Sequence, residues 1–264
     1  MAERMDNLFY DRLNDLISDA ESGIPRSGHF LDPAKQYEAE RMFNSFGRSC
    51  KMLLWGGYEN AERRMLFLLP DYFDEFDDDS SITGEFVSSN IECVLISGSG
   101  YVELDHRSFL GALCSLGIDR SHLGDIIVCD SKCAYLFCDS SIADFLTSAQ
   151  NPLTSIGRDK VKVKKCALPS ELDTSPNYQS VHDTVASARL DCVVASLCNL
   201  SRDKADEAVK SGLVSLNYSV VCDRTKEVSD GDIISMRGKG KFKIVSLGNK
   251  TKKDRFRLDA LKLK

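Results

Sequence analysis

Ten lysine and arginine side chains in the last third of the chain have the type and spacing of a surface that binds nucleic acid. Three of them, Arg202, Lys204 and Lys210, fall within one short segment of helical periodicity. Most of the others alternate with glycines and apolar residues closer to the end of the chain. The ten candidates are Arg189, Arg202, Lys204, Lys210, Arg237, Lys239, Lys241, Lys243, Lys252 and Lys253. Cations arranged in this way neutralise phosphates, so the chemistry that they predict is binding rather than bond making.

Residues suited to catalysis form weaker patterns, and we predict no catalytic residue. The run Arg189-Leu190-Asp191 matches the motif that carries the catalytic aspartate of pseudouridine synthases, but Cys-Val-Val-Ala-Ser follows it here in place of a threonine- and glycine-rich run. Asp191 is therefore interpreted as a carboxylate that the dipole at a helix N-terminus stabilises. The run Ser97-Gly98-Ser99-Gly100 leads into extended chain, whereas the glycine-rich turn of a methyltransferase leads into a helix.

Metal and cofactor sites are not predicted either. The ten cysteines include no CxxC pair, Cys129 and Cys133 being separated by three residues, and the four histidines are isolated. The acidic run at 71–79 lacks the glycine and the final glutamate of a calcium-binding loop, so we interpret it as a solvated loop. The cysteines are expected to be reduced and to act as small core residues.

The elements that would position the cations can be predicted from the segment 189–240. Its first part has apolar residues at helical spacing, namely Leu190, Val193, Val194 and Leu197. Ser201 is suited to cap a second helix, which carries the first three cations, and Ser211-Gly212 is suited to end it. Strands are predicted at 213–217 and 232–236. Asn217 is interpreted as a turn residue and not as a reader of bases.

The net charge of −6 hides an uneven distribution. Residues 181–264 hold 17 Lys and Arg against 11 Asp and Glu, whereas residues 1–180 hold 17 against 29. Residues 237–264 alone hold 11 basic and 2 acidic residues. A chain that is acidic as a whole and basic in one region is expected to meet a polyanion there.

The segment 189–240 resembles the RNA-binding domain named after the fourth protein of the small ribosomal subunit. The matching pieces, in order, are RLD at 189–191, SR-x-K-A at 201–205, SGLVSLN at 211–217 and DGDIIS at 230–235. The run R-G-x-G-K-F at 237–242, followed by T-K-K-x-R at 251–255, is similar to the YlmH family, bacterial proteins with that domain at the C-terminus. Pieces at 70–73 and 109–126 extend the resemblance over nearly the whole chain.

The middle of the chain predicts a ferredoxin-like domain, similar to an RNA-recognition fold. Strands are expected at 92–97, 125–129, 132–138 and 160–165, with helices at 107–116 and 142–149. Tyr135 and Phe137 share one face of a predicted strand, where an RNA-recognition fold would stack bases. Because the surrounding sequence is acidic and lacks the consensus of that fold, we interpret both as core residues.

The complete prediction is an α+β chain of three domains. An N-terminal domain at 1–88 has helices at 7–19 and 33–46, strands at 52–57 and 65–69, and a loop at 23–30. The ferredoxin-like domain follows at 89–168, a polar linker at 169–182, and the ribosomal-protein-S-four-like RNA-binding domain at 183–264. With 42% apolar and 28% charged residues, and no stretch near the roughly 20 apolar residues of a membrane span, we expect a soluble cytoplasmic monomer.

The resemblance implies a function in translation. A YlmH-like protein is expected to dock without catalysis on ribosomal RNA, and on tRNA, of the large ribosomal subunit, in quality control of stalled translation. It would need no cofactor, small-molecule substrate or membrane. Two alternatives stay open: an RNA-modifying enzyme of the pseudouridine synthase kind that its C-terminal domain targets, and a regulatory RNA-binding protein unconnected with ribosomes.

Overall fold

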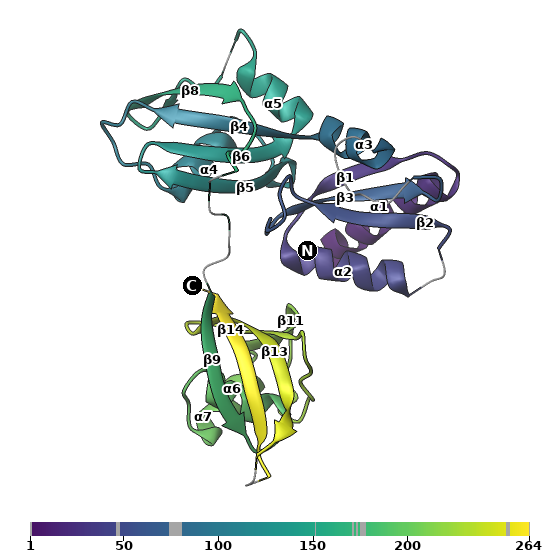
Figure 1. Ribbon diagram of the computed structural model, residues 1–264, viewed down its shortest axis with the longest axis vertical. Helices are drawn as coiled ribbons and strands as arrows, with labels where there is room; N and C mark the ends of the chain where they lie inside the picture. The colour runs from purple at the N-terminus through teal and green to yellow at the C-terminus, as the bar shows by residue number, and fades with distance from the viewer. Residues whose placement is uncertain are drawn as a thin grey trace. The chain divides into compact units, whose positions relative to one another are not determined.

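The computed structural model describes residues 2–45, 48–73, 81–150, 152–170, 172, 174, 178–251 and 254–263, and the side chains among them except those of residues 2–7 and 249. The chain divides into two compact units, Met1–Thr174 and Ser175–Lys264 (Figure 1). Both are mixed α and β, and the described strands form three sheets with antiparallel pairing. Each unit has its own buried cores.

The first unit begins with a three-stranded sheet in the order β1-β3-β2. Its elements are α1 (Ala2–Glu21), β1 (Arg26–Leu31), α2 (Pro33–Asn44), β2 (Cys50–Trp55) and β3 (Arg64–Pro70). Asp32 caps α2 by accepting a hydrogen bond from the Lys35 amide (3.0 Å), as expected for a helix that starts with proline. The expected loop at 23–30 is wrong from Arg26 onward, because that segment pairs with β3 as an antiparallel strand.

The rest of the first unit is a five-stranded sheet with helices, in the strand order β5-β6-β4-β8-β7. Its elements are α3 (Ile82–Asn90), β4 (Ile91–Gly98), α4 (His106–Ser115), the 3-10 turn η1 (Arg120–His122), β5 (Leu123–Asp130), β6 (Cys133–Asp139), α5 (Ser140–Thr147), β7 (Ser155–Ile156) and β8 (Asp159–Lys165). The strands and helices from β4 to β8 follow the predicted order, with β7 added. Helix α3 was not predicted.

The two faces of this five-stranded sheet are covered differently. Val94 and Ile96 of β4 pack with Phe109 of α4 and Leu146 of α5 in one buried cluster. On the opposite face, Phe137 belongs to a second cluster whose other members include Phe30 and Phe67 of the N-terminal sheet. Phe137 is only 3% exposed, and Tyr135 packs partly buried against the same cluster. The interpretation of Tyr135 and Phe137 as core residues is therefore confirmed.

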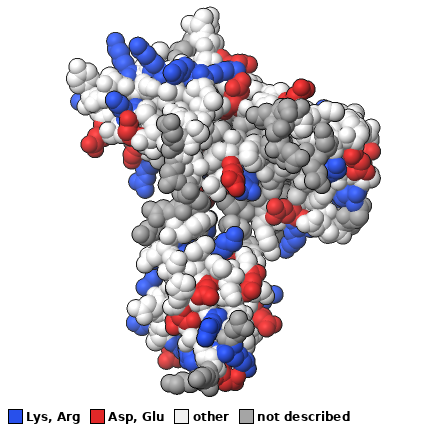
Figure 2. All heavy atoms as spheres, in the orientation of Figure 1, with Lys and Arg blue, Asp and Glu red and all other residues white. Residues whose placement is uncertain are grey.

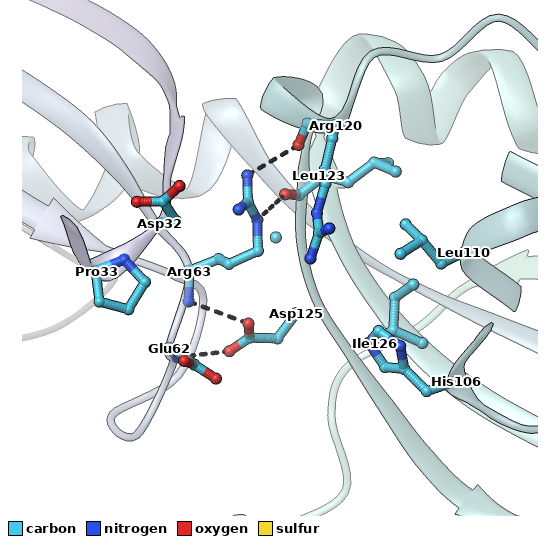
Figure 3. Close-up of a pocket in the computed structure, with 11 residues that line it drawn as sticks. Asp32, Pro33, Glu62, Arg63, His106, Leu110, Arg120, Leu123, Asp125 and Ile126 are labelled. Carbon is cyan, nitrogen blue, oxygen red and sulfur yellow. Dashed lines mark hydrogen bonds between the residues drawn. The ribbon is translucent and has the colours of Figure 1, made fainter. Parts of the chain in front are cut away.

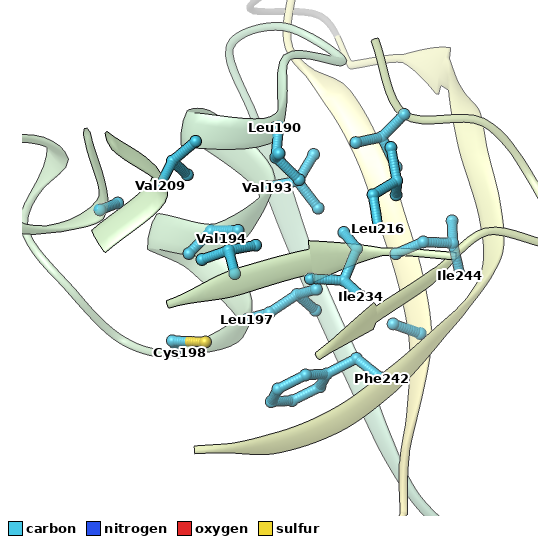
Figure 4. Close-up of a cluster of buried hydrophobic side chains, with 14 of the residues drawn as sticks. Leu190, Val193, Val194, Leu197, Cys198, Val209, Leu216, Ile234, Phe242 and Ile244 are labelled. Atoms are coloured by element: carbon cyan, nitrogen blue, oxygen red, sulfur yellow. The ribbon is translucent and has the colours of Figure 1, made fainter. Parts of the chain in front are cut away.

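The second unit is a six-stranded sheet with two helices, in the strand order β11-β10-β12-β13-β14-β9. Its elements are β9 (Tyr178–Val185), α6 (Leu190–Leu197), α7 (Arg202–Lys210), β10 (Val214–Leu216), β11 (Ser219–Val220), β12 (Ile233–Met236), β13 (Gly240–Lys250) and β14 (Phe256–Leu263). Apolar side chains of α6 point toward Ile234, Phe242 and Ile244 of the sheet (Figure 4). The interval 169–182, predicted as a linker, contains residues 178–182 of β9, a strand that pairs with β14 along its whole length.

One expectation about the cysteines is wrong. Cys129 and Cys133 form a disulfide across the hairpin of β5 and β6, with Cα atoms 5.8 Å apart. The other eight cysteines are free thiols, and five of them are buried. Among the described residues, no helix is long and apolar enough to cross a membrane.

Candidate nucleic-acid interface

The helix pair of the second unit forms as the sequence predicts. Ser201 caps α7 by accepting a hydrogen bond from the Lys204 amide (3.4 Å). Ala205, Ala208 and Val209 are buried against the core. This burial leaves Arg202, Lys204 and Lys210 exposed along the outer side of the helix, as expected.

Two of the predicted arginines are tied to α6. Arg189 precedes α6 and forms a two-point ion pair with Asp191 (Nη2–Oδ2 2.7 Å, Nε–Oδ1 3.1 Å). Arg202 donates a hydrogen bond from Nη2 to Sγ of Cys192 (3.3 Å). Asp191 also accepts from the Cys192 amide (2.9 Å), so its carboxylate serves the helix start, as predicted, and has the contacts of a structural residue.

Acidic side chains share α7 with the lysines. Lys210 forms an ion pair with Asp206 (2.7 Å), which also lies 3.4 Å from Arg224. Asp203 and Glu207 line a shallow hollow beside them. Lys204 has no ion pair with any other described residue. On the face of the second unit seen in Figure 2, basic and acidic side chains are likewise interspersed.

The turn between β12 and β13 presents two more predicted cations, Arg237 and Lys239. Gly238 and Gly240 have φ of +80° and +112°, a region that glycine enters without steric cost. The Arg237 amide donates to the carbonyl of Leu213 (3.2 Å), so the turn lies against the segment that follows α7.

Lys239 and Lys262 both act on Cys198, the last residue of the α6 region. Burial raises the pKa of the Cys198 thiol, and the positive charges of Lys239 and Lys262 oppose that rise. Lys262, which is in β14 and has its Nζ 5.5 Å from the ring centre of Phe242, was not among the predicted residues. The sequence does contain a signal for Lys262, because it alternates with Leu261 and Leu263 as an exposed residue of a strand does.

The strand β13 carries the cations Lys241 and Lys243. The Nζ of Lys241 lies 5.5 Å from the ring centre of Tyr218. Lys243 is exposed and has no ion pair within the described parts of the chain. The structure thus gathers Lys239, Lys241 and Lys243 on one strand and the turn before it. Lys252 and Lys253 lie outside the described residues.

Asn217 is a turn residue, as predicted. Asn217 and Tyr218 have φ of 47° and 66° and connect β10 to β11, as in the two-residue turns that match strand twist. The Asn217 side chain donates to Asp232 Oδ1 (2.8 Å) and accepts from the Ile233 amide (2.9 Å). Both ends of its amide are therefore engaged within the protein.

The first unit contains a small cavity of about 220 Å³ where its two sheets meet, and hydrogen bonds close it on one side (Figure 3). Asp125 accepts from the amides of Glu62 (2.6 Å) and Arg63 (3.0 Å) and from the Tyr58 hydroxyl (2.8 Å). The Arg63 guanidinium donates to the carbonyls of Leu123, Arg120 and Phe30 (2.8, 2.9 and 3.2 Å). The polar atoms of Arg63 and Asp125 are thus engaged in hydrogen bonds between the two sheets, so we assign both residues a structural role.

Two clusters have the donor atoms of a metal site. The ligand atoms of His29, His122 and Asp139 lie within 4.8 Å of one another, as do those of Cys129, Asp130 and Cys133. The second cluster contains the disulfide. In the first, His122 Nδ1 is hydrogen-bonded to Asp139 Oδ2, while Asp139 Oδ1 is buried without a hydrogen-bond partner. His29, His122 and Asp139 are therefore the residues that could hold a metal.

Comparison with known proteins identifies relatives over most of the chain. Residues 90–170 match the domain family described as "Putative RNA-binding domain in YlmH". The ribosome-associated protein quality control protein P2 of Bacillus subtilis is 33% identical over 229 residues, covering 87% of this chain and 84% of that protein. The structure of the cell division protein YlmH of Streptococcus pneumoniae is similar with a TM-score of 0.50 and 21% identity, covering 64% of this chain and 95% of that one. The structural match supports the fold. The 33% identity over 87% of the chain, together with the family match, shows that this chain belongs to the YlmH family.

Proposed function

We propose that this protein binds RNA of the large ribosomal subunit, with its second unit in contact with ribosomal RNA and tRNA, in quality control of stalled translation. It acts in the cytoplasm as a binding protein and not as a catalyst. The observation that carries the proposal is the 33% identity, over 87% of the chain, to a protein named for ribosome-associated quality control. We also assign β4 to β8 to a ferredoxin-like fold and the second unit to the ribosomal-protein-S-four-like RNA-binding fold.

The geometry of the second unit supports RNA as the ligand. Lys204, Arg237, Lys239 and Lys243 are cations without an ion-pair partner among the described residues, and they lie on a helix, a turn and a strand of one rigid core. Cations held on regular elements contact phosphates and recognise the shape of folded RNA more than its bases.

Sedimentation of cell lysate through a sucrose gradient tests the proposal. The variant Lys204→Glu/Lys239→Glu reverses two cations that have no ion pair with another described residue. The variant Arg41→Glu/Arg107→Glu makes the same charge change at exposed positions of α2 and α4. We expect the wild type and the control to run with large subunits, and the first variant to stay near the top. Fractions are compared after stalled complexes have been enriched by blocking elongation.

Two results would contradict the proposal. If both variants run with large subunits like the wild type, the second unit does not provide the contact. If the wild type stays at the top in the enriched lysate, the proposal of ribosome binding is wrong. That result would favour the alternative of a regulatory RNA-binding protein. A covalent change in bound RNA, detected by mass spectrometry of its nucleosides, would instead show an enzyme.

A further inference from the structure

A dense group of cations lies in the first unit, outside the predicted site. Residues 90–170 hold eight Lys and Arg, and five of these fall between positions 158 and 165. Four of the five lie on β8, and basic side chains form a row at the top of the molecule in Figure 2. The sum of charges over the first unit is acidic, so this local concentration cannot be recognised from net charge.

The pleat of β8 separates its lysines into two kinds. Val161 and Val163 pack into the core beneath the sheet, so the exposed side chains of Lys160, Lys162 and Lys164 extend from the opposite face. None of these three forms an ion pair with another described residue. Lys165, which follows them, is paired with Glu92 (2.9 Å) and Asp144 (2.8 Å).

The neighbouring strands leave this face without acidic side chains. In the register of the sheet, Lys162 lies opposite Ser97 and Lys164 lies opposite Leu95. Leu95 in turn lies opposite Tyr135 of β6. Successive lysines of the row are two residues apart, a distance of about 7 Å along a strand, which suits a series of phosphates on one nucleic-acid strand.

An exposed aromatic ring lies at one end of the row. Tyr101 is 94% exposed in the loop that follows β4. The loop is held in place because the carboxylate of Asp159, which is 2% exposed, binds the amide and hydroxyl of Ser99. A methyl group built on Gly100 would lie 3.5 Å from Lys132, so a further lysine is next to this loop.

The competing interpretation is that the lysines prevent aggregation at the edge of the sheet. Beyond Lys160, the described residues give β8 no partner on its outer side, and lysines on such edges prevent strand pairing between molecules. That role explains charge on the edge strand, but it does not explain an exposed tyrosine held beside the row. Cations together with an aromatic ring are the combination that binds single-stranded nucleic acid.

We propose that the face of β8 formed by Lys160, Lys162 and Lys164, together with Lys132 and Tyr101, binds single-stranded RNA. The lysines contact consecutive phosphates and Tyr101 stacks on an unpaired base. This inference rests on the proposed RNA-binding function and adds a second contact surface, in the unit that does not carry the predicted cations.

The test measures binding of the full-length protein to a fluorescent single-stranded RNA by anisotropy, over a series of salt concentrations. The variant Lys160→Gln/Lys162→Gln/Lys164→Gln removes the row. The variant Arg12→Gln/Arg41→Gln/Arg107→Gln removes the same charge at exposed positions of α1, α2 and α4. If three phosphate contacts are lost, the slope of log K against log salt should fall by about 2, and affinity at moderate salt by more than tenfold. The control should stay within about twofold of the wild type.

Tyr101 gives an independent readout that does not depend on charge. Stacking of one base contributes enough for Tyr101→Ala to weaken binding by roughly 5-fold to 100-fold, while Tyr101→Phe keeps the ring and the affinity. Because Tyr101 is almost fully exposed, neither change should lower the melting temperature of the protein.

The outcomes separate this inference from the proposed function. If the Lys204→Glu/Lys239→Glu variant weakens RNA binding and the β8 and Tyr101→Ala variants do not, the β8 surface is wrong and the proposed function stands. Increased self-association of the β8 variant with unchanged RNA affinity would show that the lysines only protect the edge. If the wild type binds no RNA, both proposals fail.

Discussion

At the scale of single residues, the predicted RNA-binding cations differ in whether they form ion pairs within the protein. Arg189 and Lys210 are predicted RNA contacts, yet each has a carboxylate at 2.7 Å. Lys204 and Lys239 have no such partner among the described residues, so RNA can bind them without first breaking an ion pair. Exposed ion pairs contribute only about 0–1 kcal/mol, so Arg189 and Lys210 can still join a contact, at a modest cost.

A first prediction concerns Asp125, which joins the two sheets of the first unit. Asp125→Ala removes the acceptor of three hydrogen bonds and leaves their donors in a partly buried place. We expect the free energy of unfolding of this unit to fall by about 2–4 kcal/mol. Urea unfolding followed by fluorescence of Trp55 checks this, since Trp55 is the single tryptophan of the chain and lies in β2.

The exposed Asp144 provides the control for that experiment. Its carboxylate pairs with Lys165 at the surface, where it is 72% exposed. Asp144→Ala should change the free energy of unfolding by less than about 1 kcal/mol. Equal effects of the two substitutions would mean that Asp125 does not hold the sheets together.

A second prediction concerns pH and His29. Burial, followed by the charge of His122, lowers the pKa of His29 below its ordinary 6.5, and Arg12 acts in the same direction while Asp139 and Asp119 oppose it. The unfolded chain then binds more protons below pH 6.5, so the free energy of unfolding falls as the pH falls through that range. We expect His29→Gln to lose less stability than the wild type between pH 7.5 and 5.5, by Trp55 fluorescence in urea.

Asp139 acts in the opposite sense. Burial raises its pKa above the ordinary 3.8, against the effect of His122, so its protonation favours the folded state as the pH falls. His182→Gln is the control, because His182 is exposed in the second unit and should not affect Trp55. An unchanged pH dependence in His29→Gln would show that His29 does not account for the loss.

At the scale of elements, turns and caps determine where the helices and strands of the second unit end. Asn217 combines a left-handed backbone conformation with side-chain hydrogen bonds to Asp232 and to Ile233, the first residue of β12. Its side chain therefore fixes β10 relative to β12, the strand that leads into the turn with Arg237 and Lys239.

Asn217 leads to a third prediction. Asn217→Gly keeps the backbone conformation and loses the hydrogen bonds, at a cost of about 1–2 kcal/mol. Asn217→Ala adds the steric cost of a left-handed residue, about 1–2 kcal/mol more. Hydrogen–deuterium exchange of peptides covering 214–236 should show protection falling in the order wild type, glycine, alanine. If glycine and alanine behave alike, backbone strain plays no part in this turn.

Local patterns in the sequence predict some elements and miss others for a physical reason. Helices α6 and α7 have apolar residues at helical spacing, and α7 also has a serine cap, so local sequence was enough to predict both. Strand β9 is mostly polar and exposed, and its stability comes from pairing with β14, about 80 residues later. Strand β1 likewise depends on pairing with β3. Such partner strands are distant in the sequence, so local sequence patterns predict loops at these strands.

The basic residues also differ in how far the sequence alone predicts them. The cations of the second unit are predictable because motif order and charge coincide there. The row on β8 lies in an acidic region, where the sum of charges hides it. Only the register of the sheet shows that Lys160, Lys162 and Lys164 share one face of β8, with no acidic residue directly opposite them.

At the scale of the whole molecule, two basic surfaces lie on two units of one chain. An RNA that engages one surface raises the effective concentration of its remaining nucleotides at the other, which can increase affinity by 10²–10⁴ without any new contact. The gain requires an RNA long enough to reach both surfaces. Affinity for RNA should therefore depend on RNA length more steeply in the wild type than in a protein that keeps a single surface.

The last prediction compares a single-stranded RNA of about 10 nucleotides, near the site size of one surface, with one several times longer. The additional binding registers of the longer RNA raise the affinity of every variant by the same factor. We expect the wild type to gain at least tenfold beyond that factor. Lys204→Glu/Lys239→Glu and the triple glutamine variant of β8 should gain only the factor itself, because each keeps one surface. The variant Arg12→Gln/Arg41→Gln/Arg107→Gln should behave like the wild type. Equal length dependence in all four proteins would show that one surface binds alone, and the variant with the weaker affinity for the short RNA would identify which surface it is.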